Sequence, residues 1–187
     1  MGRWEPNARE RLAEAALQLY AEQGYERTTV AQIAGQAGLT ERTFFRHYAD
    51  KREVLFAGSP LQDLFVTAVA EAPAAAPLPD VLGAGLDAAA AMFAGRHAYA
   101  LRRQAVVAAH AELRERELIK LAALAAALAE ALRGRGVPEP TATLAAEAAV
   151  AVFKVGFERW ITAVDETDMV PLLRELLDEL GRITART

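Results

Sequence analysis

The stretch TTVAQIAGQAGLTERTFFRHYADKREVLF, residues 28–56, contains the signals that decide the fold. Thr29 opens a helical pattern and is followed three residues later by Gln32, which is the spacing of a capping box. Gly38 ends that pattern, and Thr40 begins a second one that runs to about His47. Two short helices joined by a turn that contains Gly predict a helix-turn-helix arrangement.

The residues of the second short helix divide between an inner and an outer side. Leu39, Phe44 and Tyr48 give it an apolar underside, while the small Ala34 allows the two helices to cross closely. In a helix-turn-helix the second helix enters the DNA major groove. Arg can bind a guanine edge there, and Thr can contact a base. The residues left facing outward or at the edge are Glu41, Arg42, Thr43, Phe45, Arg46 and His47. These patterns alone also fit a helical hairpin whose Thr residues only cap and whose Arg residues are solvated.

Helical patterns account for almost all of the remaining chain, and alternating strand patterns are missing. The pair Asn7 and Glu10 predicts a first helix that ends at Gly24. Asp50 with Glu53 predicts a fourth helix to about residue 65, with a kink or break near Gly58 because Pro60 follows. Later helices are predicted at 80–95, 97–110, 112–133, 141–164 and 169–184. The sequence therefore predicts an all-α fold of about nine helices.

Composition limits the class of protein. The 187 residues are 53% hydrophobic and 25% charged, which excludes wholesale disorder. There is no cysteine, so disulfides and thiol nucleophiles are excluded. The longest apolar run, residues 121–129, is about half the length that a membrane span requires. We therefore expect a soluble cytoplasmic protein without a membrane partner.

Charge is distributed unevenly between two predicted domains. The net charge is −4, but residues 1–56 contain eight basic and eight acidic residues and are neutral. The loop APAAAPLP at 72–79 separates two architectural halves of the chain. We expect a helix-turn-helix domain at 1–56 and a second helical domain at 57–187.

The segment 28–56 resembles the N-terminal DNA-binding segment of the TetR family of transcriptional regulators. The family pattern is a Thr that opens the first motif helix, then Ile-Ala and Ala-Gly, then Gly, an apolar residue and Ser or Thr. After these come Thr, Leu-Tyr, an aromatic residue or His, and a Lys that opens the next helix. This sequence matches that pattern with Thr29, Ile33-Ala34, Gly38-Leu39-Thr40, Thr43, Phe44-Phe45, His47-Tyr48 and Lys51. One departure is Phe45, which stands where the family usually has Tyr and which cannot donate a phenolic hydrogen bond to phosphate.

The resemblance implies DNA-contacting roles for nine residues. Thr29 and Lys51 would hold backbone phosphates. Thr40, Glu41, Arg42 and Thr43 would lie at the end of the helix that enters the groove. Phe45, Arg46 and His47 would contact bases, sugars or phosphates, and Phe45 would be limited to a sugar or a thymine methyl group. Glu41 is either an acceptor from cytosine or a favourable charge in the first helical turn.

The resemblance also implies a homodimer and a small-molecule effector. In the family the last two helices form a four-helix dimer interface, which corresponds here to 141–164 and 169–184; the same apolar stripes would equally serve an intramolecular core. Middle helices of the family bind an effector that lowers DNA affinity. The candidate ligand-binding residues are Phe93, Tyr99, Arg103, His110, Phe153 and Phe157.

The function predicted from the sequence is that of a ligand-responsive regulator, with repression as the family default. It would be released from a palindromic double-stranded operator by its effector. The alternative is a TetR-like helical ligand-binding protein without specific DNA binding. No HExxH, phosphate loop or GxSxG motif is present, so we expect no enzyme, no cofactor, and neither a catalytic nor a metal site.

Overall fold

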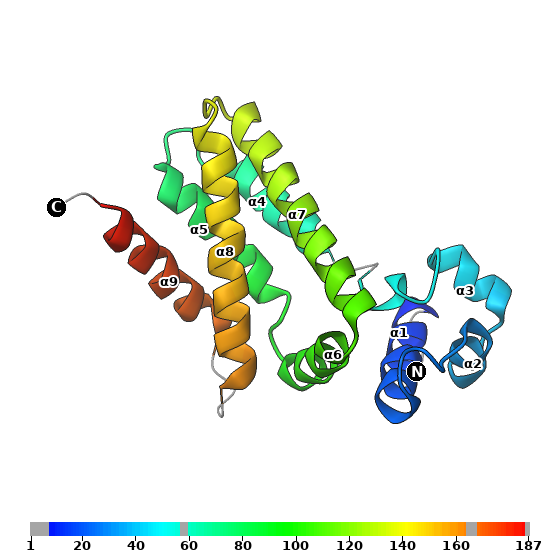
Figure 1. The fold of residues 1–187 in the computed structure, drawn as a ribbon. Helices are drawn as coiled ribbons and strands as arrows, with labels where there is room; N and C mark the ends of the chain where they lie inside the picture. Colours follow the sequence, from blue (N-terminus) through cyan, green and yellow to red (C-terminus); the bar gives the residue numbers. More distant parts are fainter. Residues whose placement is uncertain (1–7, 57–59, 164–167, 186–187) are drawn as a thin grey trace, which may run out of the picture. The chain divides into compact units, whose positions relative to one another are not determined.

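The computed structural model describes residues 8–56, 60–163 and 168–185. Within these ranges the chain forms nine α-helices and one short 3-10 helix, and no strand (Figure 1). The helices are α1 (Ala8–Gln23), α2 (Val30–Gln36), α3 (Glu41–His47), η1 (Glu53–Leu55), α4 (Leu61–Glu71), α5 (Leu78–Ala91), α6 (His97–Ala109), α7 (Ala111–Gly134), α8 (Thr141–Thr162) and α9 (Met169–Thr184). The predicted all-α fold is confirmed, and α5 to α9 lie within a few residues of the five predicted late helices.

The chain divides into two compact units. Unit 1 contains residues 1–59 and 101–118, and unit 2 contains residues 60–100 and 119–187. The chain first passes from unit 1 to unit 2 between residues 59 and 60, whereas the predicted domain boundary follows residue 56. The later return of the chain was not predicted: most of α6 and the beginning of α7 belong to the same unit as α1, α2 and α3.

Local capping fixes where α2 and α3 begin in unit 1. The Thr29 hydroxyl accepts from the Gln32 backbone N–H at 3.2 Å, and the Thr29 N–H donates to the Gln32 side chain at 2.9 Å. This reciprocal pair confirms the predicted capping box. The Thr40 hydroxyl accepts from the Thr43 N–H at 3.2 Å and caps α3 in the same way. The predicted cap of α1 at Asn7 lies outside the described residues.

The turn between α2 and α3 depends on Gly38 and on a side chain from α1. Gly38 has φ of 65°, a left-handed conformation that a residue without a Cβ adopts at little cost. Arg11 of α1 donates from Nη2 to the Ala37 carbonyl at 2.5 Å, next to this turn. An added Cβ on Gly38 would also lie 2.8 Å from that guanidinium. The left-handed backbone conformation is therefore the main reason for Gly in this turn, since the end of the flexible Arg11 side chain could move away from a Cβ.

The sequence predicted a fourth helix from Asp50 to about residue 65 with a kink or break near Gly58, and the described part of this range contains two separate helices. The Asp50 carboxylate accepts from the Arg52 N–H at 2.8 Å and from the Glu53 N–H at 3.1 Å, but it opens only the three-residue helix η1. The next helix, α4, begins at Leu61. The predicted break near Gly58 lies outside the described residues.

Unit 2 is built from close helix contacts. α5 packs on α4, α8 and α9, and α8 packs along α9 (Figure 1). A Cβ added to Gly85 would lie 2.2 Å from the Phe65 ring, and one added to Gly156 would lie 2.2 Å from Leu173 Cδ2. These two glycines therefore mark where α5 approaches α4 and where α8 approaches α9.

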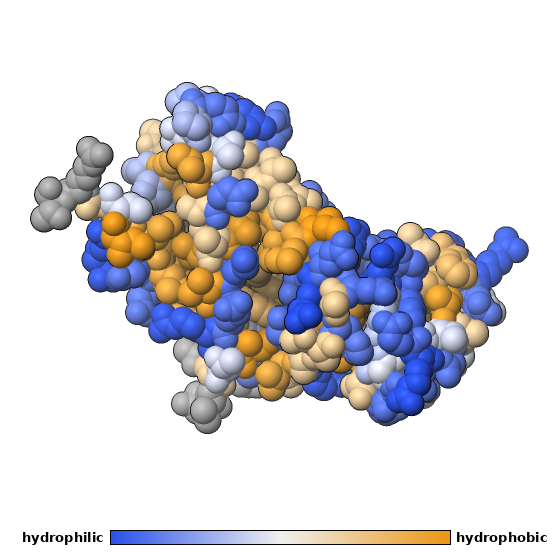
Figure 2. All heavy atoms as spheres, in the orientation of Figure 1, coloured by the Kyte–Doolittle hydropathy of each residue, from blue (hydrophilic) through white to orange (hydrophobic). Residues whose placement is uncertain are grey.

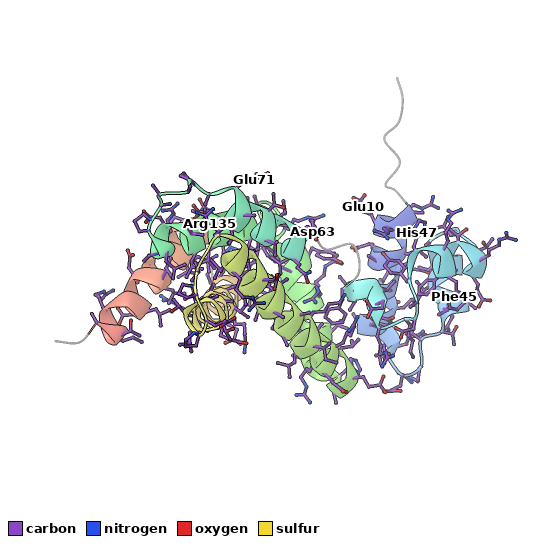
Figure 3. The ribbon with its side chains drawn as sticks, turned by 90° about the horizontal axis from the view of Figure 1, so that it is seen from above. Glu10, Phe45, His47, Asp63, Glu71 and Arg135 are labelled. Atoms are coloured by element: carbon purple, nitrogen blue, oxygen red, sulfur yellow. The ribbon has the colours of Figure 1, made fainter. Side chains whose placement is uncertain are left out.

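Arg135, just after α7, holds the segment that follows α4. Its guanidinium donates to the carbonyl groups of Ala70, Ala72 and Pro73 at 3.1, 2.7 and 2.8 Å, close to Glu71 (Figure 3). The bonds to Ala70 and Ala72 satisfy carbonyls that the end of α4 leaves without helical partners, and the third holds Pro73 just beyond the helix. In the described part of the chain, no helix combines the length and the apolar character that a membrane crossing needs.

Candidate nucleic-acid interface

The outer side of α3 carries an exposed stripe of mixed chemistry. Glu41, Arg42, Phe45 and Arg46 are all exposed, and their spacing places them on one face of the helix. Phe45 is 56% exposed, whereas its neighbour Phe44 is completely buried. Because the inner side is anchored in the core of unit 1, the orientation of this outer stripe is fixed. We call these four residues the α3 stripe.

The predicted DNA-contacting threonines hold helix ends. Thr29 and Thr40 are exposed N-caps of α2 and α3, as described above. The hydroxyl groups of Thr40 and Thr43 also lie 3.1 Å apart, within hydrogen-bonding distance. Thr40 and Thr43 therefore organise the end of α3 that begins the α3 stripe.

Lys51 is fully engaged with the protein's own backbone. Its Nζ donates to the carbonyl groups of Tyr25, Glu26 and Thr28 at 2.8, 3.3 and 3.0 Å. It also lies 4.2 Å from the centroid of the Tyr25 ring. An ammonium group has three N–H donors, and all three have acceptors here. Lys51 thus fastens the loop between α1 and α2, which leads directly into the Thr29 cap.

Tyr20 completes this fastening from α1. Its hydroxyl donates to the Lys51 carbonyl at 2.6 Å, and its ring meets Tyr25 edge-on at 5.3 Å. Burial raises the pKa of Tyr20 far above its usual value, so the phenol remains a neutral donor. Lys51 is therefore held through its carbonyl while its side chain holds the loop.

His47 lies at the edge of the candidate interface and is half-buried. Its Nε2 is buried and has no hydrogen-bond partner in the structure. Burial lowers the pKa of His47, and the nearby charges of Arg46 and Arg9 lower it further. The imidazole is therefore neutral at pH 7, and it lies beside the Tyr48 ring at 6.5 Å. His47 was predicted to face outward or to lie at the edge, and its half-buried position corresponds to the edge (Figure 3).

Residues from α6 and α7 brace the segment that follows α3. Arg103 donates to the Leu55 carbonyl at 3.1 Å and to Glu117 at 2.9 Å, and its guanidinium lies 4.8 Å from the Phe56 ring centroid. Arg116 forms an ion pair with Glu53 in η1. Sequence reasoning missed this brace because the partners are about 50 or more residues apart in the chain.

The predicted ligand-binding residues are divided between the two units. Phe93, Phe153 and Phe157 lie together in unit 2, with ring centroids 5.3 to 6.1 Å apart. Arg103 and His110 belong instead to unit 1, where His110 lies 5.8 Å from the Tyr25 ring. Tyr99 is half-buried on α6.

The aromatic cluster is completed by Trp160, which was not predicted to bind ligand, and by His97, which the sequence suggests only loosely as a contributor to the pocket. Trp160 lies 5.7 Å from the Phe93 ring, and His97 lies 4.8 Å edge-on from Trp160. The His97 Nε2 is also 3.2 Å from the Trp160 carbonyl. Helical spacing from Phe153 and Phe157 could have indicated Trp160. We call Phe93, His97, Phe153, Phe157 and Trp160 the aromatic cluster.

A second exposed surface follows α8 and α9. Figure 2 shows apolar residues gathered over these two helices. On α8, Leu144 is 66% and Val155 47% exposed, and on α9 Ile183 is 69% exposed. Ala148 and Ala151 lie between the first two along the same face of α8. We call this the α8–α9 face.

Over the described ranges, no group of three or more His, Cys, Asp or Glu side chains could hold a metal ion.

Comparison with known proteins confirms the resemblance found in the sequence. Residues 12–57 match the family model for bacterial regulatory proteins of the tetR family. The HTH-type transcriptional regulator TcmR of Streptomyces glaucescens is 45% identical over 67 residues, which are 35% of this chain and 30% of TcmR.

Solved structures extend the similarity of fold to nearly the whole chain. FadR of Thermus thermophilus, a TetR-family transcriptional repressor in complex with lauroyl-CoA, aligns with a TM-score of 0.58 over 96% of both chains at 23% identity. A regulatory protein of the tetR family from Rhodococcus RHA1 aligns with a TM-score of 0.57 over 98% of this chain and 100% of its own, at 19% identity. The fold is thus that of TetR-family regulators, with an N-terminal helix-turn-helix and a C-terminal helical part.

Proposed function

We propose that this chain, whose N-terminal segment matches the TetR family, is a homodimeric transcriptional repressor that binds a palindromic DNA operator and is released by a small-molecule effector. The observation that carries this proposal is the α3 stripe. Two exposed arginines and an exposed aromatic ring lie on a short helix, and its caps and turn fix its direction. A structural helix in a hairpin has no need of such a stripe.

The chemistry of the α3 stripe suits the DNA major groove. Arg42 and Arg46 are exposed and can each bind a guanine edge through two hydrogen bonds, or a phosphate. Thr40 caps the beginning of the helix, which is the part that lies closest to base edges in this motif. Glu41 is exposed in the first turn, where its charge also favours the helix.

The α8–α9 face supports a homodimer. A single three-helix DNA-binding domain makes few contacts with DNA. Specific recognition therefore usually uses a two-fold symmetric dimer, which doubles the number of these contacts. Leu144, Val155 and Ile183 are large apolar side chains exposed on the two last helices. A second copy that packs its own α8 and α9 against them would remove this apolar area from water.

The aromatic cluster supports an effector site in unit 2. Phe93 and Phe157 are only partly buried, so part of the cluster stays open to contact. An effector that binds one arrangement of the dimer more tightly than another must shift the DNA affinity by the same differential free energy. Lauroyl-CoA, the ligand of the Thermus FadR complex, is a reasonable first compound to test.

Selection of binders from a randomised pool of palindromic duplexes tests this function. We expect one inverted repeat to be recovered, with half-sites about one helical turn apart, ~34 Å. Arg42→Gln should then lower the slope of log affinity against log salt by about 1 per protomer if Arg42 contacts phosphate, or relax specificity at one position if it reads a base. Arg102→Gln is the matched control, since Arg102 is exposed in the same unit but pairs with Glu14 at 2.9 Å. Failure to recover any preferred duplex from ligand-free protein would favour the alternative of a helical ligand-binding protein.

A further inference from the structure

Phe45 is an unusual residue in its place on α3. Within residues 8–56 no other large apolar side chain is exposed. Its neighbours on the α3 stripe, Arg42 and Arg46, are charged and exposed. Leaving more than half of an aromatic side chain exposed to water is unfavourable, and the neighbouring Phe44 ring covers it only in part.

The ring of Phe45 is also held in a defined direction. It meets the buried Phe44 ring edge-on, with centroids 5.5 Å apart and planes at 81°. Phe44 itself is fixed in the core of unit 1 and contacts Tyr48 at 5.5 Å. Because the Phe45 ring is supported in this way, its side chain loses little further conformational entropy when a partner binds against it.

The chemistry of DNA identifies that partner. A phenyl ring can neither donate to a phosphate nor bond to a base edge. The major-groove edges of the four base pairs carry one apolar group, the C5-methyl of thymine. Arg42 and Arg46 lie on either side of Phe45 and can hold the polyanionic backbone or a guanine while the ring approaches the methyl group.

We propose that Phe45 is a specificity-determining residue that reads a thymine methyl group in each half-site of the operator. This inference rests on the proposed function, since it requires that α3 enters the major groove. Phe45 then contributes a preference for thymine over every other base through apolar contact alone. Arg42 and Arg46 supply the electrostatic attraction.

The test removes methyl groups from DNA rather than atoms from the protein. In the selected operator each thymine is replaced in turn by deoxyuridine, which keeps the base pair and lacks only the methyl, and affinity is measured by fluorescence anisotropy. At one thymine per half-site we expect a loss of about 3- to 5-fold, and about 10- to 20-fold when both half-sites are changed, as one buried methyl group predicts. All other replacements should be nearly silent.

Two protein variants assign the effect to Phe45. Phe45→Ala should bind more weakly and lose the deoxyuridine penalty at that position. Arg46→Gln should also bind more weakly but keep the penalty in full. An operator without thymine in its half-sites, a silent deoxyuridine scan of the wild-type protein, or an unchanged penalty in Phe45→Ala overturns the inference while leaving DNA binding intact. Absence of any selected duplex would instead overturn the proposed function.

Discussion

Replacing Lys51 by Met distinguishes a lysine that fastens the protein's own loop from one that holds a DNA phosphate. The resemblance to the TetR family assigns Lys51 to phosphate. The structure gives its Nζ three carbonyl acceptors, from Tyr25, Glu26 and Thr28, and the face of the Tyr25 ring. Met keeps the aliphatic length of the side chain and removes the charge and all three donors.

The expected cost can be worked from these contacts. A hydrogen bond to a charged group contributes about 1.5–3 kcal/mol net, and a partly exposed cation–π contact about 0.5–1 kcal/mol. One of the three bonds is long and exposed, and the others are partly open to water. We therefore leave out the exposed bond and the cation–π contact, take the lower end for the other two bonds, which is about 3 kcal/mol, and reduce it for their partial exposure. This gives about 2–3 kcal/mol for opening the loop between α1 and α2.

Hydrogen exchange measures this opening directly. The Thr28 N–H donates to the Tyr25 carbonyl at 3.2 Å, so it exchanges when the loop opens. In Lys51→Met its exchange should be about 30- to 150-fold faster, as 2–3 kcal/mol implies. Arg27→Met is the matched control, because it removes a charge from the same loop but only one exposed hydrogen bond, to Gln23.

The salt dependence of DNA binding completes the comparison. If Lys51 only fastens the loop, the variant should bind DNA more weakly with an unchanged salt slope. A slope that falls by about 1 per protomer, with Thr28 exchange as slow as in the wild type, would show that Lys51 contacts phosphate and that the reasoning is wrong.

Three further predictions concern packing, pH and assembly. Gly156→Ala should destabilise unit 2 by about 1–3 kcal/mol in urea unfolding because its Cβ would overlap Leu173, whereas Gly181→Ala, which meets nothing within 4 Å, should be neutral or slightly stabilising. Burial alone would raise the pKa of Asp50, but the hydrogen bonds from Arg52 and Glu53 outweigh it and hold the pKa below its usual value. Its contribution to stability is therefore present at neutral pH and lost as the pH falls through that lowered pKa, and Asp50→Asn should remove this part of the acid dependence. Val155→Glu on the α8–α9 face should give monomers in sedimentation, while Leu118→Glu, at a position that is also apolar and is more exposed but lies on α7, should leave the dimer unchanged.

Local signals were sufficient to predict the helix-turn-helix. The Thr29 capping box spans four residues, and the Gly38 turn depends on the φ of one residue. The capping box and the turn both depend on residues that are adjacent in the sequence, so both could be predicted without knowing the tertiary structure. The same local reasoning was less accurate after Asp50, which opens only the three-residue helix η1, while α4 begins separately at Leu61.

The aromatic cluster was only partly predictable, for a related reason. Phe153 and Phe157 share one face of α8, and helical spacing shows this directly. Arg103 and His110 were grouped with them because they are near Tyr99 in sequence. Periodicity shows which residues share a helix face but not which partner covers it, and here α6 runs from unit 2 into unit 1 between residues 100 and 101.

The nine residues assigned to DNA by resemblance can be sorted by what their polar atoms already do. The three donors of Lys51 are occupied, and the Nε2 of His47 is buried. The Thr29 and Thr40 hydroxyl groups accept from the first turns of α2 and α3. Lys51 and His47 can contact DNA through these atoms only by giving up a bond or by moving, which costs free energy that an exposed group does not lose. A hydroxyl that accepts a cap hydrogen bond keeps its own O–H donor, but its position is fixed by the helix end that it caps. Residues that resemble a family motif by position therefore divide into those that shape the helices and those that can read a base. Sequence-specific recognition by this chain should accordingly depend on the α3 stripe, and the DNA affinity of variants at Lys51 or His47 should change only as far as the helices themselves move.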